Sequence, residues 1–491
     1  MPSSLPSLLL FLFFQRTPWR ANMEDVFLFC DMLRGEDISE VLLRESVNFS
    51  GWPSSTERLR SVRWQLLLGT LPDRCPPGEF LSYATEAIKK QQQDWVQCID
   101  LVEPFAPHRD TREGDKTSQP KKKVMKFDES SSSSDETTMG ENPLVPAAST
   151  YYAQEHRYRI LLREIQKDVE RIFWEFSLFE KKSTKVDIET LLLAYCLLHD
   201  KDYKQGMHEI VAFCYFCVYR DRELLKEMDP MVRENYGEVM TFLDSAVEHS
   251  LSTTFALFCA ILNEGDTFVG LSRFFYREER CEQSAVLVCA ERVQQDILLT
   301  LDPPLLHLID SEYGISSATY LIRWLRLLFI REFCFSQVLH IWDLIFAERY
   351  LHQRRGRPYF IENGIILYIS AVMIKHVKPA ILQGADSALR VLMKYPPVTD
   401  AFPALLKEAV ILSNGALQPL LSVTSPTGVV AVDEGAVSRQ GAKLSETIKT
   451  LEVILNRSTT DETAPDSLDA MVDCIAELKK IRDVLLYGVS D

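Results

Sequence analysis

The chain has 491 residues, of which 46% are hydrophobic and 25% charged, and its 54 basic and 70 acidic residues give a formal net charge of −16. A composition of this kind supports a large buried core and excludes a wholly disordered chain. The acidic balance also argues against a protein that covers nucleic acid or adheres broadly to anionic lipid, because both need a dense basic field.

The first 55 residues are predicted to be an extension that precedes the folded body. Residues 8–14 form an apolar block, but no basic residue precedes them, and Arg16 and Arg20 follow. A secretory signal peptide has its basic residues on the other side, so none is predicted. Met23 is a second candidate start, which would make residues 1–22 an addition to the working protein.

The cysteines favour a reducing compartment. There are eleven, an odd number, and most are embedded in apolar runs rather than spaced as a disulfide framework. Cys214 and Cys217 form a CxxC pair with no second pair nearby. We interpret the two as buried small hydrophobic residues rather than as a redox or metal site.

From residue 56 to 415 apolar residues recur at intervals of three and four, which predicts an all-α body. A helix is predicted over 155–178. Its apolar stripe consists of Leu162, Ile165, Val169 and Ile172. The opposite side of this helix is expected to carry Glu164, Asp168 and Arg171.

Further helices are predicted along the body. One closes at His199-Asp200, a loop follows over 202–206, and the next helix covers 207–220. Others are predicted over 240–246, 253–262, 289–299, 315–329, 336–346, 364–375 and 387–393. No segment of the body has the roughly 20 apolar residues that a membrane-spanning helix needs.

Three segments lack this helical spacing of apolar residues or are separated from the body by such a segment. Residues 106–150 hold a lysine cluster, the serine tract 130–134 and few apolar residues, which predicts a disordered insertion. Residues 416–440 are rich in Ser, Thr, Pro and Gly and are predicted to be a linker. Residues 441–491 hold two amphipathic stretches separated by Pro465, which predicts a helical hairpin. This hairpin either packs on its own body or forms an intermolecular coiled coil.

The sequence lacks the common catalytic motifs. It has no GxxxxGK[ST] or GxGxxG phosphate loop, no HExxH and no GxSxG. His208-Glu209 is not followed by a second histidine four residues later, so no zinc site is predicted. We therefore expect no metal and no cofactor, and no nucleotide bound by the chain itself.

Two short segments nevertheless stand out. Residues 165–171 read Ile-Gln-Lys-Asp-Val-Glu-Arg, and residues 203–206 read Tyr-Lys-Gln-Gly. Taken alone, Arg171 is expected to pair with an acidic neighbour on an exposed helix face, either Asp168 or Glu164. The Gln-Gly pair alone is typical of an ordinary loop.

Together these segments resemble the IxxDxxR and YxQG motifs of the TBC-domain GTPase-activating proteins, which act on Rab GTPases. Three more blocks of that family occur in the same order. They are residues 59–69 (LRxxxWxxLLG), 324–329 (WLRLLF) and 338–343 (VLHIWD). The resemblance covers about residues 56–410 and implies a helical TBC domain of two subdomains within residues 56–415.

The local sequence of three segments narrows the resemblance to the subgroup of TBC domain family member 5. The segments that carry it are residues 203–209, 323–333 and 392–396. That subgroup also has an insertion ahead of its arginine motif, where this chain has residues 106–150.

The resemblance implies that the chain accelerates GTP hydrolysis by a GTP-bound Rab GTPase and hydrolyses no nucleotide of its own. Arg171 would be an arginine finger supplied in trans, a device worth roughly 10³–10⁵ in rate because it neutralises charge on the transferring phosphoryl group. Gln205 would orient the attacking water. GTP and Mg²⁺ belong to the GTPase, so the chain would need no cofactor.

Four other motif residues would support the two fingers. Ile165 belongs to the arginine motif, and Asp168 would brace the guanidinium or the local backbone. Tyr203 would pack beside the GTPase switch region and hold its loop, and Gly206 would permit close backbone approach.

One departure from the family pattern follows the arginine. Ile172-Phe173-Trp174 stands where the family usually has Thr, any residue and Pro. Because a misplaced catalytic group loses much of its effect, the alternative function is a catalytically weak Rab-binding or retromer-associated scaffold. A helical scaffold unrelated to the family is a third alternative.

The insertion carries its own candidate site. Asn142, Pro143 and Leu144 begin a short apolar element in a polar setting, suited to docking in a partner's pocket, and the subgroup resemblance implies that this partner is retromer. The alternative is a flexible loop without a partner. The serine tract 130–134 beside two acidic residues resembles an acid-directed kinase substrate. We expect a cytoplasmic protein that is recruited peripherally to endosomal membranes through its partners.

Overall fold

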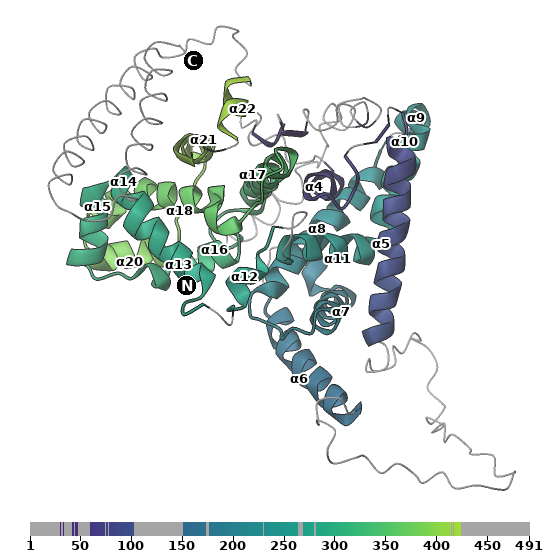
Figure 1. Cartoon of the computed structure of the whole chain (residues 1–491), viewed down its shortest axis with the longest axis horizontal. Helices are drawn as coiled ribbons and strands as arrows, with labels where there is room; N and C mark the ends of the chain where they lie inside the picture. The colour runs from purple at the N-terminus through teal and green to yellow at the C-terminus, as the bar shows by residue number, and fades with distance from the viewer. Residues whose placement is uncertain are drawn as a thin grey trace, which may run out of the picture. The chain divides into compact units, whose positions relative to one another are not determined.

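The computed structural model of the chain is built from helices (Figure 1). The structure describes residues 30, 33, 42–43, 45–47, 59–73, 75–76, 78–102, 151–172, 176–228, 230–263, 269–278, 281–413, 415 and 417–423. Every regular element in these residues is a helix, which confirms the predicted all-α class. The predicted insertion of residues 106–150 and the predicted hairpin of residues 441–491 lie outside the described residues.

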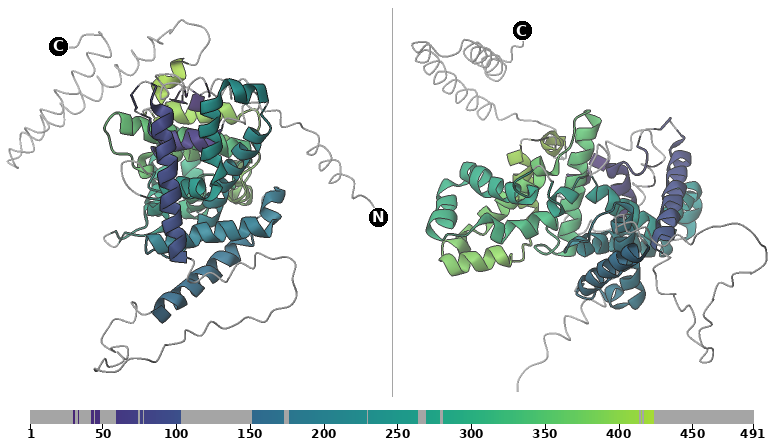
Figure 2. Two further views of the ribbon diagram at one scale, coloured as in Figure 1. Left: turned by 90° about the vertical axis from the view of Figure 1, so that its right-hand side faces the viewer. Right: turned by 60° about the horizontal axis from the view of Figure 1, so that its bottom comes forward.

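The helices form two groups that follow the order of the chain, the purple-to-teal part and the green part of Figure 2. The first group contains α4 (Arg60–Leu68), α5 (Phe80–Val102), α6 (Tyr151–Val169), α7 (Lys182–Leu198), α8 (Met207–Lys226), α9 (Pro230–Asn235), α10 (Gly237–Glu248) and α11 (Ser250–Leu262). The second contains α12 (Ser272–Phe275), α13 (Ala285–Arg292), α14 (Leu298–Leu301), α15 (Pro303–His307), α16 (Leu321–Arg326), α17 (Phe335–Arg354), α18 (Ile365–His376), α19 (Lys378–Ile381), α20 (Ala385–Met393), α21 (Phe402–Ser413) and α22 (Gln418–Val423).

Contacts between the helices agree with the predicted two subdomains. In the first group α5 packs against α7, α10 and α11, while in the second α18 packs against α16 and α21. Helix α17 contacts both α4 and α18 and so joins the groups. Short elements complete the path. They are the 3-10 helices Ser177–Glu180, Ser317–Thr319 and Ile361–Asn363 and the π-helical turns Val293–Ile297 and Leu308–Glu312.

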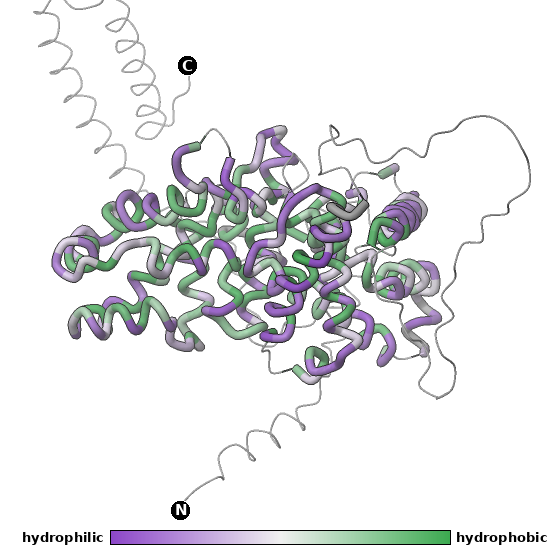
Figure 3. Tube along the Cα trace, turned by 90° about the horizontal axis from the view of Figure 1, so that it is seen from below, coloured by the Kyte–Doolittle hydropathy of each residue, from purple (hydrophilic) through white to green (hydrophobic). Residues whose placement is uncertain are grey.

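Polar and apolar residues alternate along much of the described chain, as amphipathic packed helices require (Figure 3). Trp64, Trp324 and Trp342, one from each of three family blocks, are all fully buried in the core. Trp342 lies 5.5 Å from Trp64 and 4.5 Å from Phe213 between ring centroids, which are normal distances for packed aromatic pairs.

Helix α4 is buried along its whole length, and distant residues bond backbone groups at both of its ends. Its N-terminus has no cap of its own. Asp221 of α8 accepts the Ser61 N–H at 2.7 Å and thereby supplies one. At the other end, Arg349 of α17 donates to the Leu67 carbonyl at 2.7 Å. The Trp64 indole donates to Asp343 of α17 at 2.7 Å, so the first and last family landmarks meet in the core.

The structure lengthens or shortens several predicted helices and adds others, of which α5 and α21 are the longest. Helix α5 was not predicted, although its buried residues follow a helical period. They are Phe80, Ala84, Ile88, Trp95, Cys98 and Val102. The helix predicted over 315–329 is wrong at both ends, because α16 covers only Leu321–Arg326.

The early end of α16 has a backbone cause. Leu328 and Phe329 adopt left-handed conformations, with φ of 47° and 67°, which an α-helix cannot continue. Both side chains are fully buried, and the Leu328 carbonyl accepts the Trp342 indole N–H at 3.1 Å. Packing offsets the cost of the unusual backbone, and no glycine or proline marks the position in the sequence.

Parts of the predicted flanking segments belong to the body. Within the predicted amino-terminal extension, the described apolar residues are buried in the common core; they are Cys30, Leu33, Leu42, Leu43 and Val47. Within the predicted linker of residues 416–440, α22 forms after the buried Leu417. Cys214 and Cys217 are buried on α8 as predicted.

Candidate functional site

Arg171 lies in the turn after α6, which corrects the helix predicted over 155–178. The helix ends at Val169, and the next backbone bonds tighten, because Arg171 N–H donates to the Asp168 carbonyl at 3.0 Å and Ile172 N–H to Val169 at 3.2 Å. The side chain of Arg171 is exposed. It forms no ion pair or hydrogen bond with any residue that the structure describes, so the predicted pair with Asp168 or Glu164 is not formed.

Asp168 was predicted on the side of the helix opposite its apolar stripe, but the structure buries it. It is 8% exposed and shares one side of α6 with the fully buried Ile165, three residues earlier. Its Oδ2 accepts a hydrogen bond from the Tyr203 hydroxyl at 2.9 Å. The carboxylate of Asp168 therefore braces Tyr203, and only its backbone carbonyl holds Arg171.

Tyr203 fixes the loop between α7 and α8 from within. Its buried hydroxyl lies 2.7 Å from His208 Nδ1 as well as donating to Asp168. Burial, and then the neighbouring Asp168, raise the pKa of Tyr203 far above its ordinary value, while burial lowers the pKa of His208. Because the Tyr203 hydroxyl uses its proton in the hydrogen bond to Asp168, we infer that His208 is neutral and donates from Nδ1 to the tyrosine oxygen.

The Gln205-Gly206 turn follows directly. Gln205 is exposed, and its carboxamide has no hydrogen-bond partner among the described residues. Gly206 has φ 103°, and a Cβ there would lie 2.9 Å from Leu327 Cδ2. The left-handed backbone conformation favours glycine at this position, and any larger residue would also have to displace the Leu327 methyl. The close approach is thus to the protein's own 327–334 segment.

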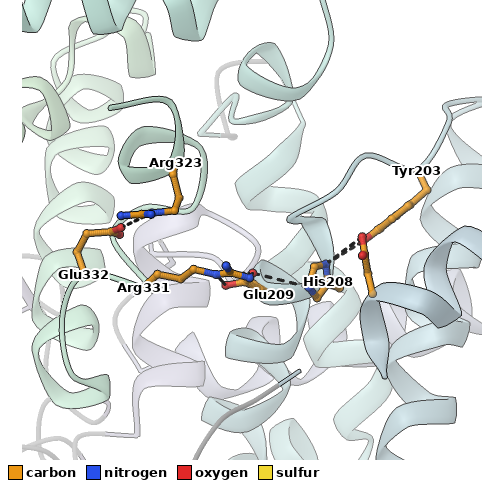
Figure 4. Close-up of polar contacts among 7 residues, drawn as sticks. Tyr203, His208, Glu209, Arg323, Arg331 and Glu332 are labelled. Carbon is orange, nitrogen blue, oxygen red and sulfur yellow. Dashed lines mark hydrogen bonds and ion pairs between the residues drawn. The ribbon is translucent and has the colours of Figure 1, made fainter. Parts of the chain in front are cut away.

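Behind the turn lies an ion pair that the sequence analysis missed (Figure 4). Glu209, in the first turn of α8, is 4% exposed, and each of its carboxylate oxygens lies 2.9 Å from Nε of Arg331. The hydrogen bonds to Glu209 raise the pKa of Arg331. The signal in the sequence was His208-Glu209, two polar residues at the start of an otherwise apolar helix segment.

A series of contacts therefore connects the segments that carry both exposed motif residues. It passes through Asp168, Tyr203, His208, Glu209 and Arg331. His208 Nε2 lies 3.7 Å from Glu209 Oε1, which closes the sequence of contacts. Arg171 is near enough to His208 to act on its charge state, as is Arg331. The predicted residues Arg171, Ile165, Asp168, Tyr203, Gln205 and Gly206 are brought to one region, whereas Asn142, Pro143 and Leu144 lie outside the described residues.

Over the described ranges, no group of three His, Cys, Asp or Glu residues could hold a metal ion. In the same part of the chain, no single helix is both long and apolar enough to cross a bilayer. The bent pair α10 and α11, at 78°, meets the length and composition criteria only when the two helices are taken together.

Comparison with known proteins identifies the class. Residues 57–382 match the RabGAP-TBC family, described as the Rab-GTPase-TBC domain, so the chain belongs to this family. It is 24% identical to human TBC1 domain family member 5 over 369 residues, 72% of this chain and 41% of that protein. A shorter match, 37% over 112 residues, links it to the Dictyostelium discoideum TBC1 domain family member 5 homolog B, covering 22% of this chain and 10% of that protein.

The resemblance predicted from the motifs is confirmed, including its subgroup. The chain spans about two-fifths of the length of the human and mouse relatives. Its fold is similar to that of the Ypt/Rab-GAP domain of Gyp1p, with a TM-score of 0.53 and 16% identity, over 80% of this chain and 98% of the other.

Proposed function

We propose that this chain is a GTPase-activating protein for a Rab-family GTPase and that it supplies Arg171 and Gln205 to the GTPase in trans. One observation carries the proposal. The two side chains project, exposed and without partners in the described residues, from segments that the Asp168–Tyr203 hydrogen bond ties together. The polar side chains beneath them are engaged with one another.

The two groups suit the chemistry of GTP hydrolysis. Negative charge on the transferring phosphoryl group is neutralised by a guanidinium that stays protonated and offers a planar fork of donors. The carboxamide of Gln205 both accepts and donates, so it can orient a water for in-line attack. Since Asp168 is committed to Tyr203, the Arg171 fork needs to break no internal ion pair before it docks.

The proposal is tested by single-turnover hydrolysis with a panel of purified, GTP-loaded Rab GTPases. We expect acceleration of at least one member, and a loss of roughly 10²-fold or more in Arg171→Ala and in Gln205→Ala. Arg159→Ala is the matched control, because Arg159 is an exposed α6 arginine paired with Glu155 at 2.6 Å. Absence of acceleration with every GTPase, or undiminished activity in both finger variants, contradicts the proposal.

A second candidate is a protein that binds a Rab GTPase without accelerating hydrolysis efficiently. It is favoured by the Ile172-Phe173-Trp174 sequence after Arg171 and by the burial of Ile172, which has no hydroxyl to offer the turn. In the same panel this candidate predicts saturable binding of a GTP-loaded Rab with an unchanged hydrolysis rate.

We further propose a place in endosomal membrane traffic, with a cytoplasmic protein brought to the membrane by its partners. The support is the resemblance to the family member 5 subgroup together with the apolar element at Asn142, Pro143 and Leu144. Retromer is the proposed partner of that element. The test compares capture of retromer by the wild-type chain and by Leu144→Asp. Equal capture by the two proteins would discard this assignment.

A further inference from the structure

The segment 327–334 between α16 and α17 lies against the Gln205-Gly206 turn and also contacts the first turn of α8. The first contact is Leu327, whose Cδ2 would lie 2.9 Å from a Cβ at position 206. The second is the ion pair of Arg331 with Glu209, three residues after Gly206 (Figure 4). The turn that carries Gln205 is thus held from one side by a segment more than 120 residues later in the chain.

The ion pair satisfies a carboxylate that the fold has buried. The carboxylate of Glu209 is almost completely buried, and a buried carboxylate is costly unless it is paired and hydrogen-bonded. Arg331 meets this need with Nε at 2.9 Å from both oxygens and with a further bond from its terminal nitrogen. The Glu209 backbone N–H in turn donates to the Gly206 carbonyl at 3.1 Å, so the charge of Arg331 acts next to the turn itself.

The same pair is connected to Arg171 through four contacts already described. Glu209 lies beside His208, His208 contacts Tyr203, and Tyr203 donates to Asp168. The Asp168 carbonyl accepts the Arg171 N–H. Contacts therefore connect Glu209 to the segments that carry both exposed motif residues.

We propose that Arg331 is a positioning residue for the GTPase-activating reaction, acting through its ion pair with Glu209 on the Gln205 turn. This inference rests on the proposed function. Arg331 needs no contact with the GTPase or the nucleotide for this role. Arg331 acts on the positions of Arg171 and Gln205. Its replacement is therefore expected to lower the hydrolysis rate at saturation rather than the affinity for the GTPase.

The chain offers a matched control in the neighbouring ion pair. Glu332, the next residue in the same segment, pairs with Arg323 at 2.7 Å, and its side chain is also fully buried. Arg323 additionally donates to the Met393 carbonyl at 2.6 Å, so this pair ties the segment to the end of α20 and not to α8. Breaking either pair removes the arginine partner of a buried carboxylate, but only the Arg331–Glu209 pair involves α8, whose first turn is hydrogen-bonded to Gly206.

The test compares Arg331→Met, Arg331→Lys and Arg323→Met in single-turnover hydrolysis at increasing concentrations of the chain. Arg331 is 56% exposed, so its replacement opens no cavity. We expect Arg331→Met to lower the saturating rate roughly 10-fold or more, with the half-saturating concentration within about 2-fold of wild type. Lysine keeps the charge but cannot bond both oxygens from one planar fork, so Arg331→Lys should recover part of the rate.

Arg323→Met should lose stability without this loss of rate. A saturating rate in Arg331→Met equal to that of Arg323→Met, or a loss confined to the half-saturating concentration, overturns the inference. If Arg171→Ala is inactive while Arg331→Met is fully active, the proposed function stands and this inference fails.

A second readout keeps the inference testable if no GTPase is accelerated. Hydrogen exchange of the backbone amides over 205–209 should be roughly 10-fold faster in Arg331→Met than in wild type and in Arg323→Met. Equal protection in all three proteins overturns the positioning role, whatever the hydrolysis assay shows.

Discussion

The Tyr203 hydroxyl joins three segments of the chain. It donates to Asp168 at the end of α6 and contacts His208 in the first turn of α8, while its own backbone belongs to the loop before Gln205. Removing this oxygen breaks the hydrogen bond between the two motifs, while the aromatic ring still fills the same volume in the core.

We expect Tyr203→Phe to lower the free energy of unfolding by about 1–3 kcal/mol, because the buried carboxylate of Asp168 loses a donor. It should also lower the rate of GTP hydrolysis at saturation. Tyr215→Phe is the control, since the Tyr215 hydroxyl donates to Asp187 at 3.0 Å from a later turn of α8. Urea unfolding and single-turnover hydrolysis measure the two effects. An equal loss of rate in both variants would remove the special role of Tyr203.

Gly206 combines two constraints that a substitution can separate. In Gly206→Ala the added methyl meets Leu327, and the backbone must also hold φ 103° with a side chain present. Gly78→Ala is the control, because Gly78 has φ 78° and nothing within 4 Å of its Cβ position. We expect Gly78→Ala to cost about 1 kcal/mol from the backbone alone and Gly206→Ala to cost clearly more. Thermal unfolding checks this, and similar costs in the two variants would show that Leu327 yields freely.

At the scale of elements, α4 depends on a carboxylate from α8. Burial raises the pKa of Asp221 from 3.8 to about 6, against the opposing effect of the Ser61 hydrogen bonds. The folded protein therefore binds this proton more tightly than the unfolded chain does. By linkage, the contribution of Asp221 to stability rises as the pH falls from about 7 towards 4.

We expect Asp221→Asn to flatten this pH dependence, because the amide oxygen still accepts from Ser61 but no longer titrates. A difference of about two pKa units corresponds to about 3 kcal/mol between pH 4 and pH 7. Burial also raises the pKa of Glu348, to about 7, so part of the trend should persist in the variant. Urea unfolding at several pH values measures it. An identical pH slope in the two proteins contradicts the assignment.

The helical period predicted most elements but not their ends. Helix α5 was overlooked because the polar run from Lys89 to Asp94 interrupts its apolar stripe. The end of α16 depends on left-handed Leu328 and Phe329, residue types that give no warning of that conformation. Local sequence specifies the period, whereas tertiary packing decides where these helices stop.

The candidate site divides in the same way. Arg171 and Gln205 were found through family motifs, which depend on residue types at fixed spacing. Asp168 was expected on the exposed side although it lies three residues from buried Ile165, which places both on one face. The contact of Glu209 with Arg331 spans 122 positions, and nothing in a single sequence pairs two such residues.

At the scale of the whole molecule, Asp343 connects the two groups of helices. From α17 it accepts the Trp64 indole N–H and pairs with Arg60, with Nε at 3.0 Å from Oδ2. All three side chains are buried. Asp343 is therefore a polar junction between the two groups of helices within an apolar core.

We expect Asp343→Ala to lower the free energy of unfolding by about 3–5 kcal/mol, because it leaves the buried Arg60 charge without this carboxylate. Glu408→Ala serves as the control. Its pair with Lys375 at 2.5 Å is about two-fifths exposed, so its loss should cost at most about 1 kcal/mol. Calorimetry measures both. A cost for Asp343→Ala as small as that of the control would mean that the groups do not depend on this junction.

The tertiary capping of α4 has a consequence for synthesis. Asp221 and Arg349, which bond the Ser61 N–H and the Leu67 carbonyl of this helix, follow their partners by 160 and 282 positions. On the ribosome, α4 emerges long before Arg349 does, so its buried face and its Leu67 carbonyl wait for most of the domain to be translated. The amino-terminal half should therefore need protection from chaperones while it waits, and a message that stops short of α17 should yield an aggregating product rather than a smaller working domain.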